Sequence, residues 1–150
     1  MAGVEPTTYD GGRALAVHWE RLVENWAARR GLATDRDGSS IAVRFAQPGG
    51  DLTVRFMATS RLMVAFITDG RQLSPDQLAL AAAAANAWNT EQLIPMLSVW
   101  DVRGPQPCLA GVCSLPLTLS LGQAAFDDLA GDWSERAGRM FRQCRQLFDL

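Results

Sequence analysis

Apolar side chains recur at helical spacing in three separate stretches of the chain. In the first stretch, residues 13–30, the apolar positions that share one helical face are Leu15, Trp19, Leu22, Val23 and Trp26. These steps of mainly three and four residues predict an amphipathic helix, which Asp10 is expected to cap at its start. The second and third predicted helices cover residues 74–89 and 120–148. The second is rich in alanine, and its small side chains favour close packing against a sheet or another helix.

Two of these helices begin with the residue spacing of a capping box. Ser74 is followed by Gln77, with a proline between them, and Ser120 is followed by Gln123. A serine at the cap and a glutamine three residues later satisfy each other's backbone N–H groups, so each serine predicts a helix start. Gly131 is expected to bend or break the third helix.

Between the first two helices, apolar and polar residues alternate as they do in strands. The segments 41–45 and 52–56 alternate strictly, whereas segment 62–68 is apolar on both faces. The short turns that separate them predict an antiparallel meander. A strand that is apolar on both faces should be covered on both sides, either by helices or by a partner chain.

Two further strands are predicted over residues 96–102 and 108–117. Gly111 and Pro116 fall inside the second, and they are expected to make it irregular or to shorten it. The segment 35–39 lacks apolar alternation and is interpreted as a turn.

The predicted order of elements is therefore α-β-β-β-α-β-β-α. Runs of strands joined by hairpin-length connections and interrupted by helices are typical of the α+β class, with an antiparallel sheet flanked by helices. We expect a single domain over residues 13–150, preceded by a flexible lead-in over residues 1–12. A chain of 150 residues is long enough for one domain with a substantial core.

Charge and composition exclude several classes of function. The 14 cationic residues are all Arg, and with 16 acids the net charge is −2. A weakly acidic chain argues against sequence-independent nucleic-acid binding, which requires a surplus of cations facing phosphates. No apolar run is long enough for a membrane-spanning helix, and the first ten residues lack the pattern of a signal peptide. We therefore expect a cytoplasmic protein with neither a nucleic-acid partner nor a membrane partner.

The residues that usually carry catalysis are scarce. His18 is the only histidine, and the absence of Lys excludes a lysine-containing phosphate loop. Cys108, Cys113 and Cys144 lack the spacing of a metal or redox motif, so they are interpreted as free, mainly buried thiols. Residues 35–39 resemble a fragment of a calcium loop without its closing acid. We expect no enzymatic activity, no cofactor and no metal.

Five residues are candidates for ligand or partner contacts. Arg44 and Arg55 are the cations of the first two predicted strands, and Asn86, Trp88 and Asn89 lie at the end of the second helix. The alternative for the second group is structural, with Asn terminating the helix and Trp packing into the core.

A series of arginines follows the last helix at every third position, namely Arg136, Arg139, Arg142 and Arg145. It is interpreted as a solvent-exposed face, and the alternative is a stripe that binds an anion or an acidic partner.

Several short motifs resemble the YbjN-like family. The most individual is the segment Asn86-Ala87-Trp88-Asn89 after an alanine-rich helix. The others are Val43-Arg44-Phe45, Val54-Arg55-Phe56, Val99-Trp100-Asp101-Val102 and Leu117-Thr118-Leu119-Ser120. The resemblance covers roughly residues 13–148. Members of this family are labelled bacterial sensory transduction regulators.

The resemblance implies a fold similar to that of type III secretion chaperones, whose members bind polypeptides and commonly form homodimers. It implies no catalytic residues. We therefore expect a non-enzymatic protein-interaction module, a regulator or chaperone-like protein that docks a polypeptide and forms a homodimer. The alternative is a protein or enzyme that binds a small anionic ligand between helix and sheet, with Arg44, Arg55, Asn86 and Asn89 as its polar groups.

Overall fold

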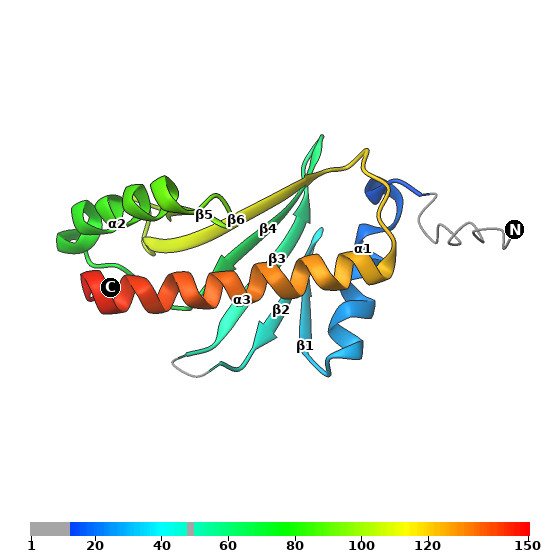
Figure 1. The fold of residues 1–150 in the computed structure, drawn as a ribbon, viewed down its shortest axis with the longest axis horizontal. Coiled ribbons are helices and arrows are strands. Elements are labelled where there is room, and N and C mark those ends of the chain that lie inside the picture. The colour runs from blue at the N-terminus through cyan, green and yellow to red at the C-terminus, as the bar shows by residue number, and fades with distance from the viewer. Residues whose placement is uncertain (1–12, 48–49) are drawn as a thin grey trace, which may run out of the picture.

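The fold consists of one antiparallel sheet and three α-helices (Figure 1). The computed structural model describes residues 13–47 and 50–150. The elements in chain order are α1 (Leu15–Arg29), β1 (Ala33–Asp37), β2 (Ser40–Phe45), β3 (Leu52–Ala58), β4 (Leu62–Thr68), the 3₁₀ turn η1 (Pro75–Gln77), α2 (Leu78–Glu91), β5 (Met96–Trp100), β6 (Cys108–Pro116) and α3 (Gln123–Phe148). The predicted α+β class and the order of the predicted elements are confirmed. The expected lead-in and the expected cap at Asp10 lie outside the described residues.

The sheet has six strands in the order β1-β2-β3-β4-β6-β5, and every pair is antiparallel. The edge strand β1 is an addition to the prediction, because residues 35–37 were interpreted as part of a turn. All five residues of β1 are exposed, so no hydrophobic alternation marks it in the sequence. Its pairing with β2 makes it a strand, and the turn is confined to the hairpin tip, where Gly38 has a φ of +58°.

The capping predictions differ in outcome. At the second helix the Ser74 N–H donates to Gln77 Oε1 at 2.9 Å, as the predicted pattern requires, and η1 leads directly into α2. The predicted start of the third helix at Ser120 is wrong, because α3 begins at Gln123 with Gly122 as its N-cap. Ser120 instead forms an isolated bridge with Ala14. The chain before α3 is therefore extended beside the start of α1.

Two predicted irregularities are absent. The helix α3 runs without interruption over 26 residues, so Gly131 does not break it. The strand β6, which was expected to be shortened, is the longest of the sheet at nine residues. Pro116 is tolerated because it is the last residue of β6. Gly111 allows α3 to approach, since a Cβ atom there would lie 3.0 Å from Met140 Cε.

The main core lies between one face of the sheet and the helices α1 and α3. Trp26 of α1 is 1% exposed, and its ring centroid lies 5.4 Å from that of Phe45, 5.8 Å from that of Phe56 and 6.4 Å from that of Phe126. These aromatic rings join α1, two strands and α3 in one cluster. In Figure 1, α3 crosses the sheet from the α1 end to the α2 end. α2 packs against β5 and against the second half of α3.

Candidate interaction surface

The second face of the sheet carries apolar side chains without a covering helix among the described residues. The strand registers place Phe66 beside Val112 and Val112 beside Met96 on this face. We call this surface the open face and define its apolar part by Met57, Leu62, Val64, Phe66, Met96, Trp100 and Val112. Exposed fractions reach 38% for Leu62, 51% for Met96 and 45% for Trp100. The expected covering of β4 on both sides is thus met by helices on one side only.

An aromatic pair lies on the open face. The rings of Phe66 and Trp100 are 4.8 Å apart at an interplanar angle of 86°, which is an edge-to-face contact. Such pairs stabilise a surface geometry and offer a large apolar area whose side chains lose little further entropy on binding. Tryptophan and phenylalanine are also enriched at protein–protein interfaces.

The two candidate strand arginines lie on the same face, beside the apolar part. Arg44 is exposed and stands opposite Ala33 and Thr53. Arg55 is half-buried, and its Nη1 donates to Ser40 Oγ at 2.9 Å. These two cations therefore form part of the polar margin of the open face. Neither arginine lines the cleft beside α1 or the cavities beside α3.

The other three candidates have separate roles at the end of α2. Trp88 is buried, and its Nε1 donates to the Pro95 carbonyl at 2.8 Å. The side-chain amide of Asn89 pairs with the backbone of Leu97, because Nδ2 donates to the carbonyl and Oδ1 accepts from the N–H, both at 2.8 Å. Asn89 thereby satisfies the edge strand β5 as a neighbouring strand would. Asn86 is exposed to solvent and takes part in neither of these side-chain contacts.

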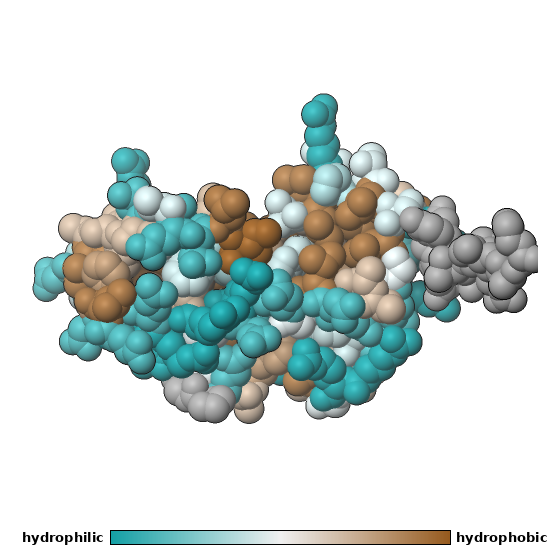
Figure 2. Space-filling view, viewed as in Figure 1, coloured by the Kyte–Doolittle hydropathy of each residue, from teal (hydrophilic) through white to brown (hydrophobic). Residues whose placement is uncertain are grey.

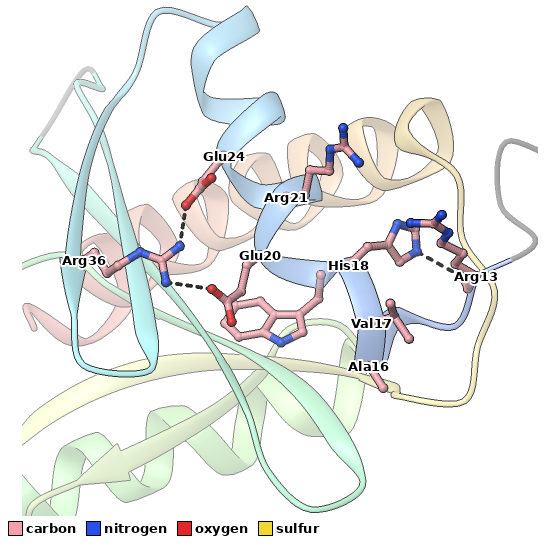
Figure 3. A pocket seen from close by; sticks show the side chains of 9 residues that line it. Arg13, Ala16, Val17, His18, Glu20, Arg21, Glu24 and Arg36 are labelled. Atoms are coloured by element: carbon pink, nitrogen blue, oxygen red, sulfur yellow. Dashed lines mark hydrogen bonds and ion pairs between the residues drawn. The ribbon is translucent and has the colours of Figure 1, made fainter.

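A cleft beside α1 holds the single histidine (Figure 3). Arg36 of β1 binds both Glu20 and Glu24, with an Nη1–Oε2 distance of 2.6 Å to Glu20. These hydrogen bonds raise the pKa of Arg36 and attach β1 to α1. His18 Nε2 lies 3.0 Å from the Arg13 carbonyl and points away from the Arg36 cluster. Among the described residues, both acids of this cleft are paired with Arg36, and His18 has no carboxylate partner.

The three cysteines are free thiols in different environments. Burial raises the pKa of Cys113 to about 12 and that of Cys144 to about 11, so both remain protonated at neutral pH. Cys108 is only partly buried, and it pairs with Trp100 across β5 and β6 on the open face. Burial, with Asp101 and Asp69 nearby, also raises its pKa. Among the described residues, no group of three or more His, Cys, Asp or Glu side chains could hold a metal ion.

The arginine series of α3 does not act as one group. Arg136 Nε pairs with Asp132 at 2.8 Å, and Arg145 Nη2 lies 3.9 Å from the largely buried Asp69 carboxylate. Arg139 and Arg142 are exposed to solvent. The interpretation of the series as a solvent-exposed face therefore fits Arg139 and Arg142 best.

The residues that sequence reasoning missed are the aromatic and apolar side chains of β5 and β6 on the open face. Their strand order was the obstacle, because β6 lies between β4 and β5 and brings Val112 and Met96 beside Phe66. The one signal available in the sequence was the two-sided apolar pattern of residues 62–68.

The fold and the surface together define an α+β protein with a sheet that is helix-covered on one face and open on the other. No family model and no curated protein matches this chain. Among solved structures, the chain is similar to YbjN of E. coli, which is described as a proposed transcription regulator. The two chains share 12% sequence identity at a TM-score of 0.68, over 85% of this chain and 91% of YbjN. The YbjN-like fold expected from the motifs is confirmed.

Within residues 13–47 and 50–150, none of the helices combines the length and the apolar composition needed to cross a bilayer.

Proposed function

We propose that this protein is a non-enzymatic interaction module, a regulator or chaperone-like protein, that docks a polypeptide partner on its open face. The observation that carries this proposal is the uncovered apolar surface over β3–β6, with Met96 and Trp100 about half exposed. Burying such a surface is favourable by roughly 25 cal/mol per Å² of apolar area removed from water. Contiguous exposed apolar surface of this kind marks interaction sites in proteins.

The shape and chemistry of the open face favour a polypeptide over a small anion. Its apolar part extends across four strands, as a polypeptide interface requires, and Arg44 and Arg55 stand at its margin. An apolar centre with a polar rim is the usual anatomy of a protein–protein interface. The similarity of fold to YbjN supports a regulatory role. A cytoplasmic location stays a prediction from the sequence.

The homodimer expected from the family resemblance is part of this proposal. We expect the purified protein to show twice the chain mass of 16.3 kDa by light scattering at micromolar concentration. A monomer mass under these conditions would contradict the dimer and leave the docking of a different polypeptide to be tested separately.

We expect the variant Met96→Thr/Trp100→Thr to lose its partner while keeping its fold. Threonine is favourable in strands, and both side chains are already about half exposed. The free energy of unfolding should therefore change little. The measurement is affinity capture from the native cell with quantitative mass spectrometry. The captured amount of proteins that bind the open face should fall at least about tenfold, which corresponds to about 1.4 kcal/mol of binding free energy.

The matched control for this experiment is Val17→Thr. Val17 is an apolar side chain that is 71% exposed on α1, away from the open face. Its replacement should leave the captured proteins unchanged. Equal capture by the wild-type protein and by the double variant would contradict the proposed role of the open face.

A further inference from the structure

A groove runs between α2 and α3, on the side of the molecule opposite the open face. Two cavities lie in it, a depression on α3 alone adjoins them, and all three are lined by Gln143 of α3. The first, of about 140 Å³, also involves Trp88 and Ile94, and the second, of about 80 Å³, involves Trp88 and Leu147. The third is a wide depression of about 420 Å³ along the exposed side of α3. We call this surface the α2–α3 groove.

The floor and the α2 wall of this groove are mainly apolar. Their apolar side chains are Ala84, Ala87, Trp88, Ile94, Leu147 and Phe148. Leu147 is 66% exposed and Ile94 is 47% exposed, and the neighbouring Leu93 is 88% exposed. Figure 2 shows hydrophobic surface over the connection between α2 and β5, next to the hydrophilic band that follows α3. Apolar side chains this exposed are available to anchor a ligand.

The α3 wall of the groove is basic. Arg136 and Arg139 line the first cavity, and Arg139 and Arg142 line the depression. Arg136 is paired with Asp132, whereas Arg139 and Arg142 form no hydrogen bond or ion pair with the part of the chain that the structure describes. The α2 wall contributes one acid, Glu91. The groove thus carries a surplus of positive charge on a protein whose net charge is −2.

We propose that the α2–α3 groove binds an acidic amphipathic segment of a partner protein. The apolar side of the segment would bury Ile94 and Leu147, and its carboxylates would face Arg139 and Arg142. An amphipathic helix laid into an apolar groove is a common mode of peptide recognition. The lining residues of α3 extend from Arg136 to Phe148, about 18 Å at 1.5 Å per residue, which matches a segment of about three helical turns.

Charge complementarity and the apolar floor favour a polypeptide over a nucleic acid. Arginine forms bidentate contacts with carboxylates and phosphates alike, so the cations do not decide between them. The exposed side chains Ile94 and Leu147 favour a polypeptide, because a phosphate backbone offers no apolar surface against which they could be buried. The α2–α3 groove is separate from the open face, so binding at one surface can be tested independently of binding at the other.

The test uses a fluorescent peptide of about twelve residues, with leucines at positions i, i+3, i+4 and i+7 and glutamates elsewhere. A peptide of equal composition with its leucines spread around the helix is the matched probe. Fluorescence anisotropy should show binding of the first peptide to the wild-type protein, weakened by added salt because exposed charges contribute. The variant Arg139→Glu/Arg142→Glu should weaken binding at least about tenfold.

The control Arg21→Glu/Arg61→Glu makes the same charge change at two exposed arginines away from the groove, and binding should stay close to that of the wild-type protein. The variant Met96→Thr/Trp100→Thr should also bind the peptide normally, which separates this site from the open face. The proposal would be overturned by no binding to the wild-type protein, by equal binding of both peptides, or by equal loss in the control. Tighter binding of a short DNA duplex that depends on Arg139 and Arg142 would assign the groove to nucleic acid instead.

Discussion

Replacing Trp26 by alanine is expected to lower the free energy of unfolding by about 3–5 kcal/mol, as large-to-small core substitutions of aromatic residues do. The indole is almost fully buried and contacts Phe45, Phe56 and Phe126, so its removal leaves a cavity where α1, the sheet and α3 meet. Equilibrium denaturation in urea, followed by far-ultraviolet circular dichroism, measures the change.

The graded control is Trp26→Phe. The buried Nε1 atom of Trp26 has no hydrogen-bond partner within residues 13–47 and 50–150. Phenylalanine therefore keeps much of the ring and removes a polar group that these residues leave unsatisfied. We expect this variant to lose much less stability than the alanine variant. The variant Trp100→Ala, which removes an exposed side chain, should change the free energy of unfolding least of the three. A Trp26→Ala variant as stable as Trp100→Ala would contradict the position of Trp26 at the centre of the core.

Replacing Asn89 by alanine is expected to destabilise the protein by about 2–4 kcal/mol, because the N–H and the C=O of Leu97 both lose their partner. The variant Asn89→Asp should be less stable than the wild-type protein, because the carboxylate can accept from the Leu97 N–H but cannot donate to the Leu97 carbonyl. The free energy of unfolding is again the quantity measured. Hydrogen exchange at the Leu97 amide should accelerate in the same variants.

Asn86→Ala is the matched control on the same helix. Asn86 is exposed, and its backbone carbonyl, which accepts from Thr90 Oγ1 at 2.7 Å, is unaffected by the substitution. Its replacement should change stability by less than about 0.5 kcal/mol, as is usual on surfaces. If Asn86→Ala and Asn89→Ala had equal effects, the pairing of Asn89 with β5 would not contribute to stability.

These contacts show which parts of the fold the sequence could predict. The helix of residues 13–30 and the strands of residues 41–45 and 52–56 were predictable because their apolar positions face one core and repeat with the period of the element. The strand β1 was not predictable in this way. It is exposed along its whole length, and only its pairing with β2 and the contacts of Arg36 with α1 define it.

The surfaces were harder to predict than the fold, for a physical reason. Strand order decides which side chains become neighbours, and β6 lies between β4 and β5 although it follows both in the chain. Phe66 and Trp100 are therefore in contact across a strand that lies later in the sequence. Asn89 illustrates the opposite case. Its type and position favour a helix end, but its partner Leu97 becomes visible only in three dimensions.

The two surfaces give the molecule distinct docking chemistry on its two sides. The open face is a broad apolar surface with arginines at its margin, and the α2–α3 groove has an apolar floor with arginines along its α3 wall. Under the two proposals, the protein would bind one polypeptide on its sheet and a second, acidic segment beside α3. The two sites share no lining residue, so variants of each can be tested separately.

The open face carries a natural probe of its own occupancy, the thiol of Cys108. Cys108 pairs with Trp100 at the edge of the apolar surface and is partly exposed, whereas Cys113 and Cys144 are buried, with pKa values of about 12 and about 11. Since alkylation requires the thiolate, a small alkylating reagent at mildly alkaline pH should modify Cys108 first.

The most direct test of the open face as a docking surface is therefore the rate of Cys108 alkylation with and without the captured partner, read by mass spectrometry of the intact chain. A partner that docks on the open face should slow the modification of Cys108 severalfold. The variant Met96→Thr/Trp100→Thr, which should not bind, should show no such protection. An unchanged rate for the wild-type protein, in a complex that size-exclusion chromatography shows to be intact, would contradict docking on this face.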